Sequence, residues 1–169
     1  MANPTMTLIA SNTVGSGGVA SVTFSSIPST YTDLLIKISA RDLYPDVTPD
    51  ILVTFNSSGS GYSNIWLQGN GSSASSSSYS GAFIDILSDG STATTNTFSN
   101  IEMYIPNYTG SNYKSVSVND VLENNATASY MRLLAGLWSN TAAITSISFA
   151  AATSFAQYST FNLYGIKNS

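Results

Sequence analysis

The chain has 169 residues, of which 43% are hydrophobic and 8% are charged, whereas charged residues make up about 25% of typical soluble domains. A chain of this length can bury a core as one domain, so we expect a single domain over residues 1–169. The net charge is −4, with five Lys and Arg residues in all. Because binding to nucleic acid or to an anionic membrane requires clustered cations, we expect neither as a partner.

Alternation of apolar and polar residues predicts β-strands, because successive strand side chains point to opposite faces. The pattern begins in residues 5–14 and is clearest in 34–41, where Leu34, Ile36 and Ile38 share one face. The same alternation marks residues 22–24, 51–55, 101–105, 116–118, 147–151 and 159–169. Clusters of Gly, Pro, Asn and Ser separate these stretches. We predict an all-β fold, an antiparallel β-sandwich of about ten or eleven strands.

The Ser-rich stretch GNGSSASSSSYSG at 69–81 lies in the middle of this pattern. It has too little apolar surface to offset the conformational entropy lost on ordering, so we predict a solvent-exposed loop. An alternative is a loop that orders on a neighbouring subunit, with Tyr79 as its anchor.

The stretch ATASYMRLLAGLWS at 126–139 fits either a helix or a strand. It contains helix formers and no Pro, but Gly136 interrupts it. Alternate residues also fit one face of a strand: Met131, Leu133, Ala135 and Leu137. We favour the strand.

The chain ends in another strand pattern, STFNLYGIKNS at 159–169, with Phe161, Leu163 and Gly165 on one face. A terminal strand can lie in the middle of a sheet in a Greek-key sandwich. We therefore predict that this strand closes a sheet.

The residue types for most catalytic and metal sites are missing, since the sequence has no His and no Cys. That excludes Ser–His and Cys–His nucleophile pairs and removes the usual ligands of zinc, copper and iron. The nearby carboxylate pairs are Asp46–Asp50, Asp85–Asp89 and Asp120–Glu123. Each lies at or beside a predicted turn, where Asp binds local backbone N–H groups, and the spacing of Asp42, Asp46 and Asp50 matches no calcium loop. We expect no catalytic residue, no metal and no cofactor.

Three aromatic residues near the Ser-rich stretch are candidates for an interface: Trp66, Tyr62 and Tyr79. Trp66 is out of phase with Ile65 and Leu67 and close to Tyr62 in sequence. Burial in the core, contact with another protein and stacking on a sugar all remain open for Trp66 and Tyr62.

Several longer stretches resemble short structural proteins of tailed bacteriophages. They are LIASNTVGSGGVASVTFSSIPSTYTDLLIKISAR, YIPNYTGS, VLENNATASY, GLWSNTAAITSISF and STFNLYGIKNS, at 8–41, 104–111, 121–130, 136–149 and 159–169. The resemblance covers nearly the whole chain in order. It implies a β-sandwich of jelly-roll type, assembled as a homotrimer on the outer surface of the virion, and it brings no catalytic motif.

Two functions follow from this resemblance. The first is a capsid decoration, or cement, protein that stabilises the phage head by binding the major capsid protein. The second is a receptor-binding module of a tail fibre or tip that stacks host glycans on Trp66 and Tyr62. An enzyme acting on polysaccharide through a carboxylate pair ranks behind both, and we expect no enzyme.

Overall fold

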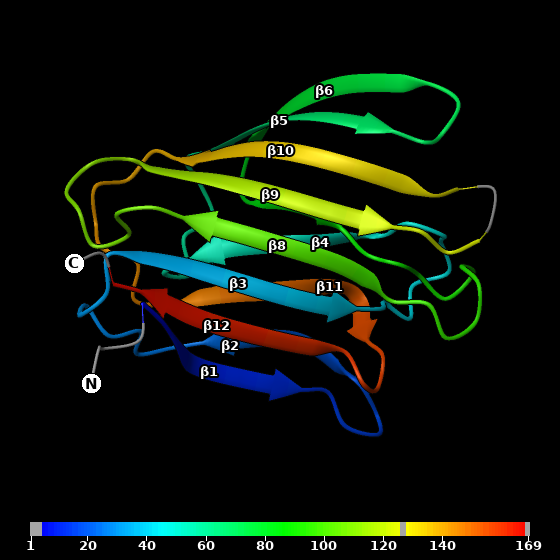
Figure 1. The fold of residues 1–169 in the computed structure, drawn as a ribbon, viewed down its shortest axis with the longest axis horizontal. Helices are drawn as coiled ribbons and strands as arrows, with labels where there is room; N and C mark the ends of the chain where they lie inside the picture. The colour runs from blue at the N-terminus through cyan, green and yellow to red at the C-terminus, as the bar shows by residue number, and fades with distance from the viewer. Residues whose placement is uncertain (1–4, 126–127, 168–169) are drawn as a thin grey trace.

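The computed structural model describes residues 5–125 and 128–167, and all of their regular elements are β-strands (Figure 1). The strands are β1 (Met6–Thr13), β2 (Val19–Phe24), β3 (Asp33–Ala40), β4 (Asp50–Phe55), β5 (Tyr62–Gly69), β6 (Ala74–Gly81), β7 (Ile84–Leu87), β8 (Ser99–Ile105), β9 (Lys114–Leu122), β10 (Tyr130–Trp138), β11 (Ile147–Phe155) and β12 (Thr160–Ile166). The described residues contain no helix long and apolar enough to cross a membrane.

Two antiparallel sheets pack face to face (Figure 1). The large sheet has the strand order β1–β12–β3–β8–β9–β10–β5–β6, and the small sheet has the order β2–β11–β4–β7. The predicted all-β antiparallel sandwich is confirmed. The described residues form twelve strands, where the sequence pattern predicts ten or eleven.

The chain crosses repeatedly from one sheet to the other. Strands β1 to β4 lie alternately in the large and the small sheet, and β7–β8 and β11–β12 cross in the same way. The antiparallel pairs β5–β6 and β9–β10 both stay in the large sheet. Figure 1 shows that β5 and β6 carry the large sheet past the small one, at the top of the view.

The core lies between the sheets and follows the period-two pattern. In β9 every second residue is buried, and the same holds in β8 and β12. Four Phe residues that the pattern assigns to the core are buried: Phe24, Phe55, Phe149 and Phe161. Trp138 is buried too, with its ring centroid 5.7 Å from that of Phe55 and 6.1 Å from that of Tyr62.

The C-terminal strand β12 lies inside the large sheet, between β1 and β3. Phe161, Leu163 and Gly165 face the core, so the prediction that this strand closes a sheet is confirmed. A Cβ atom added at Gly165 would lie 2.3 Å from Cγ of Tyr31. The Tyr31 ring therefore packs directly on the backbone of β12, which only glycine permits.

Replacing Gly165 with Ala should lower the free energy of unfolding by about 1–2 kcal/mol, because the Tyr31 ring must move away from the strand. Urea unfolding followed by tryptophan fluorescence measures the change. The matched control is Gly59→Ala, since a Cβ there meets no atom within 4 Å. Equal stability of the two variants would contradict the close contact at Gly165.

Residues 128–139 of the ambiguous stretch contain β10, so the strand we favoured is confirmed for them; residues 126 and 127 lie outside the described residues. The loop predicted at 69–81 is wrong, because β6 spans most of it. β6 pairs with β5 over eight residue pairs without a shift in register. The side chain of Asn70 accepts hydrogen bonds from the backbone of Ser72 and Ser73, which closes the turn. The prediction considered side-chain burial and omitted main-chain pairing with a neighbouring strand.

Candidate interaction surface

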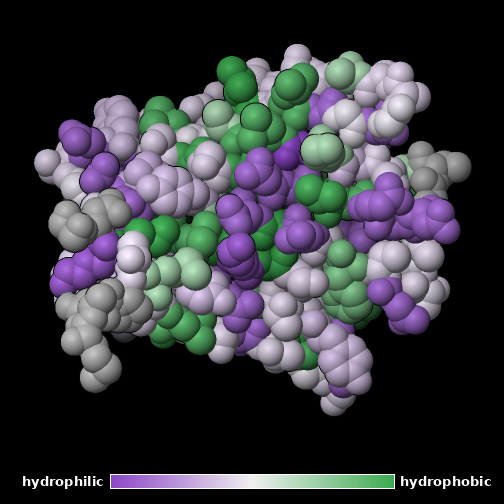
Figure 2. Space-filling model, viewed as in Figure 1, coloured by the Kyte–Doolittle hydropathy of each residue, from purple (hydrophilic) through white to green (hydrophobic). Residues whose placement is uncertain are grey.

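The outer face of the large sheet, which faces the viewer in Figures 1 and 2, is divided into two parts. Over β3 and β8 it is polar. Lys37 Nζ lies 2.9 Å from Glu102 Oε2, and the Tyr104 hydroxyl donates to Asp33 Oδ2 at 2.8 Å. The Lys37 and Glu102 side chains are exposed and well hydrated, so this part resembles an ordinary solvent-facing sheet.

The other part, over β5, β9 and β10, is apolar. Its large side chains and their exposed fractions are Ile65 63%, Leu67 56%, Val121 38%, Met131 68% and Leu133 57%. We call these five residues the apolar patch. Leu133 lies opposite Leu67, and Met131 lies opposite Val121, so the residues are neighbours across three adjacent strands. Figure 2 shows hydrophobic atoms gathered in the upper part of this face, over these strands.

Strand β10 explains why this part of the sheet is unusual. Its sequence YMRLLAGLW is apolar on both faces except at Arg132. Leu134 and Trp138 point into the core, while Met131 and Leu133 point outward and are exposed. Strands that are apolar on both faces normally lie in sheets covered on both sides. In the described structure only the inner face of β10 is covered.

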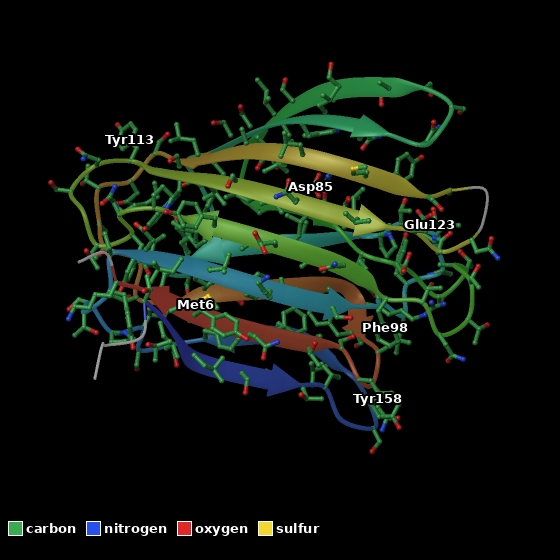
Figure 3. The ribbon with its side chains drawn as sticks, in the orientation of Figure 1. Met6, Asp85, Phe98, Tyr113, Glu123 and Tyr158 are labelled. Carbon is green, nitrogen blue, oxygen red and sulfur yellow. The ribbon has the colours of Figure 1, made fainter. Side chains whose placement is uncertain are left out.

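A groove of about 900 Å³ crosses the apolar patch where the strands end. One wall is the turn between β5 and β6, including Asn70 and Gly71, and the other includes Glu123 and Tyr130. Leu67, Val121, Met131 and Leu133 also line it. Glu123 is labelled in Figure 3, beyond the end of β9. A concave apolar surface with a few polar groups at its margin is suited to binding another molecule.

A buried ion pair lies on the inner side of β9 and β10, behind the patch. Arg132 Nη2 is 2.9 Å from Asp120 Oδ2, and the two side chains are 2% and 0% exposed. The backbone N–H of Leu87 donates to Asp120 at 2.9 Å, and Arg132 Nη2 donates to the Asp85 carbonyl at 2.8 Å. The ion pair therefore connects the large sheet to β7 at the edge of the small sheet. Burial raises the pKa of Asp120, which the Arg132 guanidinium and the Leu87 N–H oppose by stabilising the carboxylate.

Of the acidic side chains in the described residues, that of Asp85 in β7 has the pKa furthest from its ordinary value. Its pKa is raised from the ordinary value of 3.8 to about 7, first because the carboxyl is buried and second because Asp50 carries a negative charge nearby. Its Oδ1 atom has no hydrogen-bond partner in the described structure. Asp50 lies in β4, the strand that pairs with β7. Figure 3 labels Asp85 near the middle of the molecule.

The carboxylate pairs singled out by the sequence are not the pair of carboxyl groups that interacts in the structure. Asp46 accepts the Val47 N–H at 2.6 Å, a local turn contact as predicted. Asp120 and Asp85 are not turn residues, because they lie within β9 and β7. The carboxyl groups that interact are Asp50 and Asp85, which the sequence assigned to different pairs. No group of three or more acidic side chains among the described residues is arranged to hold a metal ion.

The three aromatic candidates also do not form the exposed site that the sequence suggested. Tyr62 is 2% exposed, and its hydroxyl accepts the Phe55 N–H at 2.7 Å, so an exposed Tyr62–Trp66 platform is wrong. Trp66 is half-buried on the inner face of β5, with the Arg132 guanidinium 5.5 Å from its ring centroid. Tyr79 stacks on Phe83 with centroids 5.1 Å apart. Ile65 and Leu67 point outward and are exposed, although a more apolar strand face usually points inward.

Comparison with known proteins adds little. No protein-family model matches the chain, and no curated protein matches it. Among solved structures it is similar to a variant fructofuranosidase from Schwanniomyces occidentalis in complex with fructosylnystose, at 7% identity and a TM-score of 0.30. That match covers 99% of this chain but 35% of the fructofuranosidase chain, and so weak a likeness carries no functional argument.

Proposed function

We propose that this chain is a non-enzymatic structural protein of a tailed-phage virion, a capsid decoration protein that binds the major capsid protein. The observation that supports it is the apolar patch of Ile65, Leu67, Val121, Met131 and Leu133 on one uncovered sheet face. Large contiguous apolar patches are rare on the surfaces of soluble monomers and mark interaction sites. The resemblance to phage structural proteins supplies the kind of partner.

The chemistry of the patch suits a protein partner. The outward residues of β5, β9 and β10 include no charged side chain, and the remainder are Ser, Ala, Asn and Gly together with Leu137. An interface over this face buries apolar area without removing charges from water, which is the usual composition of an interface core. Charged residues make up only 8% of the chain, which is tolerable if neighbouring proteins in a particle cover much of its surface.

The order of the strands supports a jelly-roll interpretation. The orders β1–β12–β3–β8 and β2–β11–β4–β7 interleave in the way expected of two four-stranded jelly-roll sheets. In that interpretation β5–β6 and β9–β10 are additions to one sheet. The apolar patch lies on these additions, so we infer that the added strands serve contact with the capsid.

The test is binding to purified capsids that lack this protein. We expect Leu133→Asp to weaken binding at least about 30-fold, because a charge in the centre of an apolar interface removes a hot spot worth about 2 kcal/mol. The control is Ser21→Asp, at an exposed position of β2 on the outer face of the small sheet, away from the proposed interface. Equal binding by both variants would contradict the proposal.

Location in the particle provides a second test. Immunogold labelling of virions should decorate the head over its whole surface, at a copy number comparable to that of the major capsid protein. Labelling confined to the tail would contradict the decoration role and favour the receptor-binding module instead.

A further inference from the structure

Strand β6 forms one edge of the large sheet and is exposed to an unusual degree. Six of its eight residues are exposed, on both faces, and no strand of the described structure pairs with its outer edge. Its neighbour β5 is the one strand that orders it. Edge strands of soluble proteins usually carry a charge, a Pro or a bulge that prevents pairing with another chain. β6, with the sequence ASSSSYSG, has none of these.

The other sheet edges are better protected. β1 pairs with β12 with a shift in register between Leu8 and Ala10, a bulge of the kind that discourages further pairing. β7 is four residues long, and β2 pairs with β11 irregularly beyond Ala150. The described structure therefore leaves one long, regular, uncharged edge, and that edge is β6.

We propose that β6 pairs antiparallel with β6 of a second copy of this chain, about a two-fold axis normal to the sheet through Ser77 or Ser78. This makes a dimer in place of the homotrimer that the resemblance to phage proteins implies. The distribution of charged residues favours a second copy of this chain at the β6 edge. Each chain carries a net charge of −4, so two copies repel wherever acidic groups meet. Neither β5 nor β6 contains a charged residue, so the two sheets can join here without that repulsion.

The side chains of β6 also fit this pairing. Residues directly opposite each other in an antiparallel pair point to the same face. With the axis at Ser77, Ser76 lies opposite Ser78 and Ser75 lies opposite Tyr79; with the axis at Ser78, Ser77 lies opposite Tyr79. In none of these pairs are both side chains large, and Ser hydroxyls that lie opposite each other can form hydrogen bonds.

The pairing has a consequence for the apolar patch. An axis normal to the sheet keeps the outer faces of both copies on the same side. Both patches then lie on one face of a continuous sheet, and the dimer can bind a particle through two patches at once. Bivalent binding of this kind multiplies modest affinities.

The first experiment is cysteine cross-linking, which is clean because the chain has no Cys. Only the residue on the axis meets its own copy at a Cα–Cα distance of about 4.5–5.5 Å, within the range of a disulfide. On mild oxidation, one of Ser77→Cys and Ser78→Cys should form a covalent dimer. Ser117→Cys on β9, an exposed position away from the edge, is the control and should not. Failure of both edge variants to cross-link would overturn the proposal.

The second experiment is sedimentation velocity of the unmodified chain over a range of concentrations. We expect a species with twice the mass of one chain. In Ser76→Lys/Ser78→Lys we expect the association constant of this dimer to fall at least about tenfold. Ser115→Lys/Ser117→Lys, the same charges on β9, should dimerise as the unmodified chain does. A monomer at every concentration, a trimer, or a dimer that tolerates the edge lysines would each contradict the pairing. The edge-lysine variant keeps the apolar patch, so its binding to capsids tests the proposed function separately.

Discussion

Replacing Arg132 with Met should lower the free energy of unfolding by about 3–5 kcal/mol, because it leaves the Asp120 carboxylate buried without a counter-ion. The Asp120 side chain is fully buried, and it also accepts a hydrogen bond from the backbone N–H of Leu87. The Met side chain fills a similar volume, so the loss reports the uncompensated charge rather than a cavity. The same substitution also removes the hydrogen bond that Arg132 donates to the Asp85 carbonyl and the contact of the guanidinium with the Trp66 ring.

Urea unfolding followed by tryptophan fluorescence measures this change. The control is Lys37→Met, which breaks the exposed pair with Glu102, whose side chains are 51% and 44% exposed. It should cost less than about 1 kcal/mol. Replacing both partners, as Asp120→Leu/Arg132→Met, should recover much of the lost stability, since no lone charge then remains in the core. A loss at Arg132→Met no larger than that at Lys37→Met would show that the buried pair is not formed.

The period-two pattern was sufficient to predict the fold class and much of the core. It works well where a strand has one apolar and one polar face, as in β3 and β12. There the sequence assigns Leu34, Ile36, Phe161 and Leu163 to the core, and all four are buried. The position of β12 inside the large sheet was predictable from topology, because a terminal strand can lie in the middle of a sheet in a Greek-key sandwich.

The pattern fails where both faces of a strand are apolar. In β10, alternation groups Met131 with Leu133 and Arg132 with Leu134, but it does not say which set points inward. The more apolar set points outward, because Arg132 finds Asp120 on the neighbouring strand and is neutralised there. That pairing joins residues twelve positions apart and becomes visible when the strand register is known.

The same reversal explains the candidate site. On β5 the period-two pattern places Trp66 opposite in phase to Ile65 and Leu67, which is correct, but the face with Tyr62 and Trp66 points inward. The exposed surface is consequently Ile65 and Leu67. The Ser-rich strand β6 was missed for a different reason, although the dipeptide Asn70–Gly71 is a typical hairpin turn. Its order comes from main-chain pairing with β5, which composition does not reveal.

Replacing Asp85 with Asn should make the protein more stable at pH 8 by roughly 2–3 kcal/mol, with little change at pH 4. The folded-state pKa of Asp85 is raised from 3.8 to about 7 by burial and by Asp50. Between these two values the folded protein keeps the proton and the unfolded chain has lost it. The contribution of this group to stability is therefore complete below about pH 4 and is lost as the pH rises to about 7.

The pH dependence distinguishes this effect from a change in packing. In the unmodified protein, urea unfolding at a series of pH values should show stability falling between pH 4 and pH 7, and Asp85→Asn should flatten that part of the curve. Asp46→Asn, which removes an exposed carboxyl at a turn, is the control for the loss of a negative charge outside the buried region. A constant difference between Asp85→Asn and the unmodified protein at every pH would contradict the raised pKa. Since Asp85 also provides the carbonyl that binds Arg132, a neutral side chain there relieves negative charge beside the buried ion pair without removing a bond from it.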